Sequence, residues 1–343
     1  MIARRSLLGG AGALLAAPSV MPAHASNAPG HLPWQENLAP VIVEDGVRFD
    51  LPGVRIGTAE YREGPTGCNV FHFPEGATCE VDARGGSPGI YYPTTRIEAL
   101  FLSGGSLYGL EVGTGVAREL FAQRQRAVVG TIGLVSGAII FDYVRRSTLV
   151  FPDQRLGAAA FRAAMPGRFP VGARGAGCSA SIGQIGSSRF VPEQGGQGCA
   201  VGRIGDATIG VFTVLNPLGA IFDRQGQLLR GYMDRETGTR RSLDYIIANH
   251  PRELGLIQNT AGSHTTITAV IIDRQVPGLE LRQLGRQIHA AMAQAIRPFH
   301  TPLDGDVLFA VSAGKQPLTI PAALAAEVGS QLALDAIYSA IPG

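Results

Sequence analysis

Apolar runs separated by turn residues predict most of the strands and helices of this chain. Short β-branched and aromatic runs bounded by Gly, Pro and Asn are typical of strands. Apolar positions that recur three and four residues apart are typical of amphipathic helices. Strands are predicted at residues 54–58, 68–73, 96–102, 207–215, 266–273 and 307–312. Helices are predicted at residues 107–123, 155–164 and 279–296.

The most apolar of these strands begins at a pair of threonines. Residues 266–272 read Thr-Ile-Thr-Ala-Val-Ile-Ile, and such a β-branched run is typical of a strand buried on both faces. We therefore expect this strand at the centre of a sheet. Residues 221–263, which precede it, are polar and rich in charge. We expect this segment to form an exposed excursion, where a chain can be opened without losing its core.

The N-terminus has the features of an export signal. Arg4 and Arg5 precede an apolar stretch rich in Gly and Ala, and Ala23-His24-Ala25 provides the small residues of a cleavage site. The arginine pair favours twin-arginine export over an ordinary secretory signal, and the stretch is shorter than the roughly 20 residues of a membrane-spanning helix. We predict a signal peptide at 1–25, a leader at 26–49, and a periplasmic or secreted mature protein with no membrane partner.

Charge and cysteine content narrow the possible partners and cofactors. Lys and Arg total 29 against 27 Asp and Glu without a basic cluster, so a small molecule rather than a nucleic acid is the expected partner. In an oxidising compartment, four cysteines allow three disulfide pairings, one of which joins Cys68 to Cys79 and Cys178 to Cys199. Because none of the four has the spacing of a metal or redox motif, we predict neither a metal nor a cofactor.

Two glycine-rich turns resemble functional motifs. Residues 85–89 read Gly-Gly-Ser-Pro-Gly, with the spacing of a serine-hydrolase elbow. In that elbow the residue after the serine donates a backbone N–H, and Pro88 has none, so we expect a structural turn. The second turn, residues 104–106, precedes a predicted helix. It would either bind an anion at the helix N-terminus or only pack the helix against a strand.

Three polar clusters lie at the ends of predicted strands. His264-Thr265-Thr266 heads the central strand, Asp304-Gly305-Asp306 precedes a later strand, and Asn216 follows an earlier one. Each cluster alone has an ordinary structural use in strands or turns. Their joint occurrence is the strongest indication of a catalytic site in this sequence.

Several longer motifs connect these clusters to a known family. They lie at residues 81–89, 102–110, 139–142 and 295–306. With them, the chain from about residue 51 to 317 resembles the DmpA-type aminopeptidases, which include L-aminopeptidase/D-amidases, β-aminopeptidases and nylon-oligomer hydrolases. The resemblance implies an N-terminal-nucleophile hydrolase with an α/β fold, a four-layer αββα sandwich.

The resemblance also implies that the chain cuts itself. The bond between His264 and Thr265 matches the family's cleavage site, so cleavage would give a large subunit, residues 50–264, and a small subunit, residues 265–343. The Thr265 hydroxyl would attack the preceding carbonyl and form an ester that water hydrolyses. The freed α-amine, with a reference pKa of about 7.7 to 8, would then act as the base for the same hydroxyl.

The resemblance assigns the remaining roles to the other two clusters. Asp304 and Asp306 would hold the new ammonium group and orient the Thr265 hydroxyl by charge-assisted hydrogen bonds. The Asn216 amide would stabilise the developing oxyanion. No metal or cofactor is required by this chemistry.

Three positions depart from the family pattern. His264 stands where an asparagine usually precedes the cut, and Gln184 stands where a lysine is common, which removes a positive charge. Phe141 stands where some members have a tyrosine, and Tyr143 would replace its hydroxyl only if this segment were a strand. We expect Gln184 and Phe141 in the substrate pocket.

The predicted function is hydrolysis of amide or ester bonds in small substrates. Short peptides, amino-acid amides, β- or D-peptides and polyamide oligomers are the expected substrates, and the resemblance suggests a homo-oligomer. Two alternatives remain: an unprocessed serine esterase, and a non-catalytic periplasmic binding or scaffold protein that keeps the fold. Self-cleavage at Thr265 distinguishes the first alternative, because it predicts two fragments of very unequal size on a denaturing gel.

Overall fold

The structure, a computed structural model, describes residues 35–124, 133–254 and 264–341. The chain divides into two units, residues 1–37 and residues 38–343. Of the first unit, only a short 3-10 helix is described, so the predicted signal peptide lies outside the described residues. Within the described part of the chain, no helix is both long and apolar enough to cross a membrane.

Two β-layers form the centre of the second unit, and the long strand β4 (Thr66–Ala83) belongs to both. The first part of β4 pairs with β3 and β6, whereas its last part pairs with β19, with a register shift between His72 and Ala77. Hydrogen bonding therefore continues from one layer into the other. The principal strands are β3 (Arg55–Tyr61), β6 (Arg96–Ser103), β7 (Val135–Ile139), β11 (Gly196–Ile204), β12 (Ala207–Asn216), β17 (Thr265–Ile272) and β19 (Val307–Ser312).

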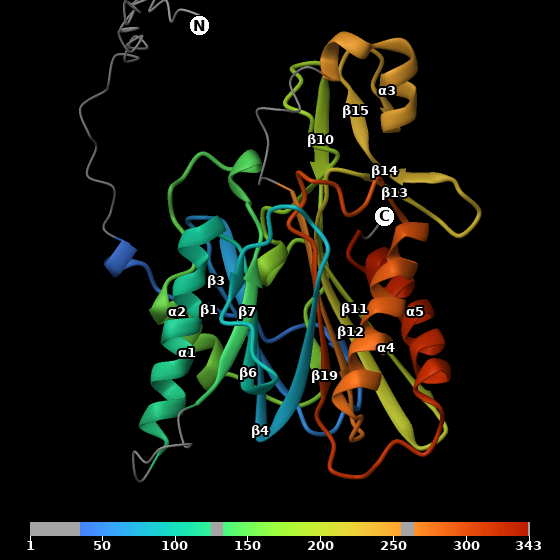
Figure 1. Cartoon of the computed structure of the whole chain (residues 1–343). Coiled ribbons are helices and arrows are strands. Elements are labelled where there is room, and N and C mark those ends of the chain that lie inside the picture. The colour runs from blue at the N-terminus through green and yellow to red at the C-terminus, as the bar shows by residue number, and fades with distance from the viewer. Residues whose placement is uncertain (1–34, 125–132, 255–263, 342–343) are drawn as a thin grey trace, which may run out of the picture. The chain divides into compact units, whose positions relative to one another are not determined.

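Helices cover the outer face of each β-layer (Figure 1). Helices α1 (Glu111–Ala122) and α2 (Gln154–Arg162) pack on the layer of β3, β4, β6 and β7. Helices α4 (Gly278–Ala291) and α5 (Ala322–Ser339) pack on the layer of β11, β12, β17 and β19. A third apolar core lies between the two β-layers, where the rings of Phe71 and Phe212 lie 5.2 Å apart. The predicted four-layer αββα sandwich is confirmed.

The remaining elements are short. The strands are β1 (Val41–Ile42), β2 (Val47–Arg48), β5 (Ile90–Tyr91), β8 (Arg168–Phe169), β9 (Ser181–Ile182), β10 (Phe190–Gln194), β13 (Ala220–Phe222), β14 (Leu228–Arg230), β15 (Tyr232–Asp234), β16 (Thr239–Arg241) and β18 (Ile296–Arg297). The helices are α3 (Leu243–Asn249) and the 3-10 helices η1 (Gln35–Asn37), η2 (Ser106–Leu110), η3 (Tyr143–Arg145), η4 (Gly175–Gly177) and η6 (Met292–Gln294).

The predicted helices are present, with changes at their ends. Helix α2 begins where Asp153 caps it, because the carboxylate accepts the backbone N–H groups of Arg155 and Leu156. The helix predicted at 107–123 begins as the 3-10 helix η2 and continues as α1. The helix predicted at 279–296 ends as α4 at Ala291 and continues through η6 into β18.

The segment expected to be an exposed excursion, residues 221–263, is mostly exposed or half-buried where the structure describes it, but it also forms regular elements with a small core of their own. Strands β13 to β16 form small sheets there, and helix α3 follows them. In Figure 1 these elements lie above the sandwich. Tyr232 and Ile246 are fully buried in a satellite core with Phe190 and Leu218. The segment is polar on its surface but has enough apolar side chains to close a core of its own. Residues 255–263 lie outside the described residues.

The structure contradicts the disulfide expectation, because all four cysteines are free thiols. Cys68 and Cys79 lie eleven residues apart on strand β4. At roughly 3.3 Å per residue their Cα atoms are far beyond the roughly 7 Å limit for a bridge. Burial raises the pKa of the thiols of Cys79 and Cys199 to about 12. These side chains act as small apolar groups of the core.

Candidate active site

Strand order brings the three predicted clusters to one edge of the sheet. Strand β17 pairs antiparallel with β12, which sets Asn216 directly opposite Thr265. It pairs in parallel with β19, and parallel neighbours begin at the same edge. The residues just before the two strands therefore meet, as the bridge between His264 and Asp304 shows.

The Thr265 hydroxyl lies against the carbonyl group that it is predicted to attack. It donates a hydrogen bond to the His264 carbonyl oxygen. The same oxygen accepts the backbone N–H of Gly305 at 2.8 Å. Thr265 is only 3% exposed, so these bonds form away from bulk water. The Gly305 N–H polarises the carbonyl and would stabilise the negative charge that develops on its oxygen when the Thr265 hydroxyl attacks.

The absence of a side chain at Gly305 makes this approach possible. A Cβ built there would lie 2.8 Å from the Thr265 hydroxyl oxygen and 2.8 Å from the Ser87 carbonyl oxygen. Both contacts are closer than Cβ atoms normally allow. A residue other than glycine would therefore displace the hydroxyl, the neighbouring turn, or both.

The glycine-rich turn at residues 85–89 supports the aspartate turn from behind. The Ser87 N–H donates to the Asp304 carbonyl oxygen at 2.9 Å, and the Gly85 N–H donates to the Asp306 carbonyl oxygen at 3.2 Å. This turn is structural, as its Pro88 indicates. The sequence does not predict the hydrogen bonds between this turn and the aspartate turn, because more than 200 residues separate the two segments.

The Asp306 carboxylate is fully buried and holds the start of β17. Its Oδ1 accepts the backbone N–H of Thr266 at 2.7 Å, and its Oδ2 accepts the backbone N–H of His300 at 3.0 Å. Asp306 therefore binds the residue that follows Thr265. The backbone nitrogen of Thr265 is the atom that becomes an amine if the chain is cut before it.

The Asp304 carboxylate is held on the other side of the turn. Its Oδ1 accepts the Leu218 N–H and its Oδ2 accepts the Thr301 N–H, both at 3.2 Å. Among the described residues, no hydrogen bond joins Asp304 or Asp306 to the Thr265 hydroxyl. In the uncut chain the hydroxyl instead donates to the preceding carbonyl.

Burial shifts two ionisable groups of the site in opposite directions. Burial, together with the nearby charge of Asp306, raises the pKa of Asp304 to about 6. Burial lowers the pKa of His264 to about 4, although the Asp306 charge opposes this shift. The His264 imidazole is therefore neutral at neutral pH, and it adds no charge beside the bond to be cut.

The raised pKa of Asp304 predicts a pH-dependent effect of Asp304→Asn on the stability of the uncut chain. Between pH 4 and 6 the folded protein keeps a proton that the unfolded chain, with a pKa near 3.8, has lost. This carboxyl thus contributes stability below pH 4 that is lost as the pH rises through 6. The uncharged side-chain amide of an asparagine does not titrate, so Asp304→Asn should remove this pH-dependent loss of stability.

Denaturant unfolding of Thr265→Ala, with and without Asp304→Asn, measures this difference while keeping both chains intact. We expect the double variant to gain free energy of unfolding relative to the single variant as the pH rises from 4 to 6. A constant difference across this range would rule out the raised pKa.

Asn216 is oriented by Gln184 and by the segment around Phe141. Its Nδ2 donates to the Phe141 carbonyl oxygen at 3.0 Å. Its Oδ1 accepts the Ser181 backbone N–H at 2.9 Å and the Gln184 Nε2–H at 3.1 Å. Gln184 is 2% exposed. The structure therefore places Gln184 behind Asn216, where it fixes the direction of the Asn216 amide.

The condition for Tyr143 to replace the missing tyrosine hydroxyl is not met. Strand β7 ends at Ile139, and Tyr143 begins the 3-10 helix η3. The rings of Phe141 and Tyr143 nevertheless lie 5.4 Å apart, edge to face. The Arg146 guanidinium lies 3.9 Å from the centre of the Tyr143 ring. Both rings are therefore held beside the backbone segment that contacts Asn216.

The turn at residues 104–106 binds a carboxylate from the same chain. The Gly105 N–H donates to Asp142 Oδ1 at 3.0 Å, and the same oxygen lies 2.7 Å from Arg146. Both members of this ion pair are buried. Because Asp142 already occupies the Gly105 N–H, the structure favours the packing role for this turn.

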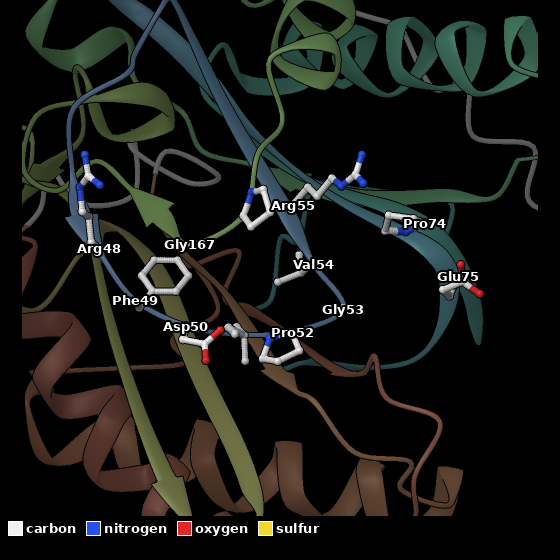
Figure 2. Close-up of a pocket in the computed structure, with 12 residues that line it drawn as sticks. Arg48, Phe49, Asp50, Pro52, Gly53, Val54, Arg55, Pro74, Glu75 and Gly167 are labelled. Carbon is white, nitrogen blue, oxygen red and sulfur yellow. The ribbon is translucent and has the colours of Figure 1, made fainter.

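One surface cavity lies away from these residues. It has a volume of about 590 Å³ and is lined by residues 48–55, 74–75 and 166–167 (Figure 2). The catalytic candidates contribute nothing to its lining. Within the described ranges, no group of three or more His, Cys, Asp or Glu side chains is placed to hold a metal ion.

Comparisons with known proteins agree on one family. The model of peptidase family S58 matches residues 46–341. A 6-aminohexanoate-oligomer endohydrolase of Kocuria sp. is 41% identical over 308 residues, covering 86% of this chain and 85% of the relative. An enzyme of the same name from Paenarthrobacter ureafaciens is 41% identical over 320 residues, covering 89% of each chain.

Solved structures support the fold. The L-aminopeptidase D-Ala-esterase/amidase of Ochrobactrum anthropi, described as a variant of the Ntn hydrolase fold, has a TM-score of 0.63 at 14% identity, covering 87% of this chain and 88% of its own. A β-aminopeptidase of Burkholderia sp. has a TM-score of 0.60 at 14% identity, with the same coverage.

Proposed function

Because this chain belongs to peptidase family S58 and is a hydrolase, we propose that it cuts itself before Thr265 and then uses this residue to hydrolyse amide bonds. The observation that carries the proposal is the contact between the Thr265 hydroxyl and the His264 carbonyl, whose oxygen also accepts the Gly305 N–H. The nucleophile, the reacting carbonyl and an oxyanion donor are thus adjacent in the uncut chain.

Self-cleavage proceeds by transfer of an acyl group within one residue. The Thr265 oxygen attacks the His264 carbonyl carbon, and the oxyanion that forms is held by the Gly305 N–H. The C–N bond then breaks, the proton of the hydroxyl passes to the departing nitrogen, and an ester joins His264 to the Thr265 oxygen. Water hydrolyses the ester, which leaves a carboxyl group on His264 and a free amine and hydroxyl on Thr265.

The new amine then acts as the base for the Thr265 hydroxyl in substrate turnover. The α-amine of Thr265 takes the hydroxyl proton during attack on a substrate amide and later gives it to the leaving amine. Asp304 and Asp306 stabilise the ammonium group that forms when the amine takes this proton, by charge-assisted hydrogen bonds. Asn216, opposite Thr265 on β12, stabilises the oxyanion of the tetrahedral intermediate, and water then hydrolyses the acyl ester on Thr265.

We propose short polyamide oligomers of the 6-aminohexanoate type as substrates. The names of the relatives at 41% identity support this class, and their matches cover most of both chains. The burial of Thr265, which is only 3% exposed, suits short flexible chains better than folded proteins. Amino-acid amides and esters are the second class to test.

A substrate panel tests this proposal directly. Purified protein is incubated with linear 6-aminohexanoate oligomers, aminoacyl amides and aminoacyl esters, and the release of amine or alcohol is followed. We expect turnover of the oligomers by wild type and none by Thr265→Ala. Turnover that Thr265→Ala retains would instead favour an unprocessed esterase with another nucleophile.

A further inference from the structure

Two histidines that the proposed mechanism does not use lie behind Asp306. His300 precedes the aspartate turn, and His289 lies in the last turn of α4. Their ring centres are 4.3 Å apart, edge to face. His289 is fully buried, and the side chain of His300 is 16% exposed. Buried imidazoles beside a catalytic carboxylate require a physical reason, because burial of polar rings is costly without partners.

Each histidine is held by a carboxylate through the same ring atom. His300 Nδ1 lies 3.2 Å from Asp306 Oδ2, and His289 Nδ1 lies 2.9 Å from Asp82 Oδ2. A carboxylate can only accept a hydrogen bond. The ring hydrogen is therefore assigned to Nδ1 in both histidines. Among the described residues, the Nε2 atoms of both rings have no hydrogen-bond partner.

The charges around His289 support this assignment. Burial opposes the charge on Asp82, yet its pKa is lowered because His289 and Arg84 stabilise the carboxylate. Arg84 Nε lies 2.7 Å from Asp82, and Arg286 lies 4.0 Å from it. Burial also lowers the pKa of His289. The pair is therefore an ionised carboxylate and a neutral ring with Nδ1–H directed at it.

The backbone of His300 adopts an uncommon conformation that serves Asp306. Its φ is +61°, in the left-handed region that favours Gly and Asn. In this conformation, both its backbone N–H and its Nδ1–H reach Asp306 Oδ2, at 3.0 and 3.2 Å. With both donors on Oδ2, Oδ1 faces the Thr266 N–H at 2.7 Å. A residue held in a sparsely populated conformation at a candidate site indicates a functional constraint.

We propose that His300 is a positioning residue: it fixes the Asp306 carboxylate in the direction that receives the α-amine of Thr265, and the Asp82–His289 pair braces its ring. This inference rests on the proposed function. It follows the general pattern in which an outer layer of hydrogen bonds orients the group that touches the reacting atoms.

Three substitutions at His300 separate its ring from its backbone conformation. His300→Asn tolerates the left-handed φ and keeps a side-chain N–H donor, whereas His300→Gly tolerates the φ but has no donor. His300→Ala loses both. We expect kcat for a 6-aminohexanoate oligomer to stay within about three-fold of wild type in His300→Asn. In His300→Gly it should fall by roughly 10- to 100-fold, with little change in KM.

Equal kcat values for His300→Gly and wild type, or no advantage of His300→Asn over His300→Gly, would overturn the inference. If the glycine and alanine variants do not fold, the ¹⁵N chemical shifts of the histidines in intact Thr265→Ala test the inference, because they report which ring nitrogen carries the hydrogen. We expect the Nδ1–H form for His300 and His289, and an Nε2–H form for His300 would refute the positioning role. Failure of the proposed function itself has a different signature, since wild type would then show no chain beginning at Thr265.

Discussion

Thr265→Ala is expected to abolish self-cleavage and to lower turnover of amide substrates by roughly a million-fold, the effect of removing a nucleophile that works in concert with its base. The variant lacks the hydroxyl that lies against the His264 carbonyl oxygen, and without the cut it also lacks the α-amine. A denaturing gel should show a single uncut chain, and an amine-release assay should show no turnover above background.

Two matched variants identify the hydroxyl as the cause. Thr265→Ser keeps a hydroxyl at the same position and should still be cut, although its freer side-chain rotamers should slow the reaction. Thr266→Val removes the neighbouring hydroxyl, which has no hydrogen-bond partner among the described residues, and keeps the shape of the side chain. It should be cut at the wild-type rate. Cleavage of Thr265→Ala, or its loss in Thr266→Val, would place the nucleophile elsewhere.

Gly305→Ala is expected to slow self-cleavage by at least about 100-fold, because removal of one oxyanion donor typically costs 100- to 1,000-fold in rate. The new Cβ would lie 2.8 Å from both the Thr265 hydroxyl oxygen and the Ser87 carbonyl oxygen. The backbone can relieve this contact only by moving the Gly305 N–H away from the His264 carbonyl, or by moving the hydroxyl. The rate of appearance of the fragments on a gel measures the effect.

Gly278→Ala provides the control for a general effect of adding a methyl group. Gly278 begins helix α4, and a Cβ there would meet only the end of the Glu80 side chain, at 3.2 Å. This variant should be cut at the wild-type rate. Thermal unfolding of both variants in the Thr265→Ala background shows whether they fold. A folded Gly305→Ala chain that cuts itself at the wild-type rate would disprove the role of the Gly305 N–H.

The central strand and the family could be predicted because their signals are local. The β-branched run of β17 identified a strand buried on both faces, and all eight of its residues are buried. The motifs around it predicted the family that the comparisons confirm. The position of Asn216 opposite Thr265 could not be predicted in this way, because it depends on strand order. The structure shows it in the pairing of β12 with β17.

Other features could not be predicted because they depend on contacts between distant segments. Helix α5 is rich in alanine on several faces, so its apolar positions have weak helical periodicity. Gln184 appeared as a residue of the substrate pocket, but the structure directs its amide at Asn216. The histidines behind Asp306 were missed because His289 and His300 belong to separate elements that only the fold brings together.

The most direct test of the mechanism is N-terminal sequencing and intact mass of the purified protein, followed over time together with turnover of a 6-aminohexanoate oligomer. We expect one chain that begins at Thr265, another that ends at His264, and activity that rises in step with their amounts. Full activity in a preparation whose chain remains joined at this bond would contradict the mechanism.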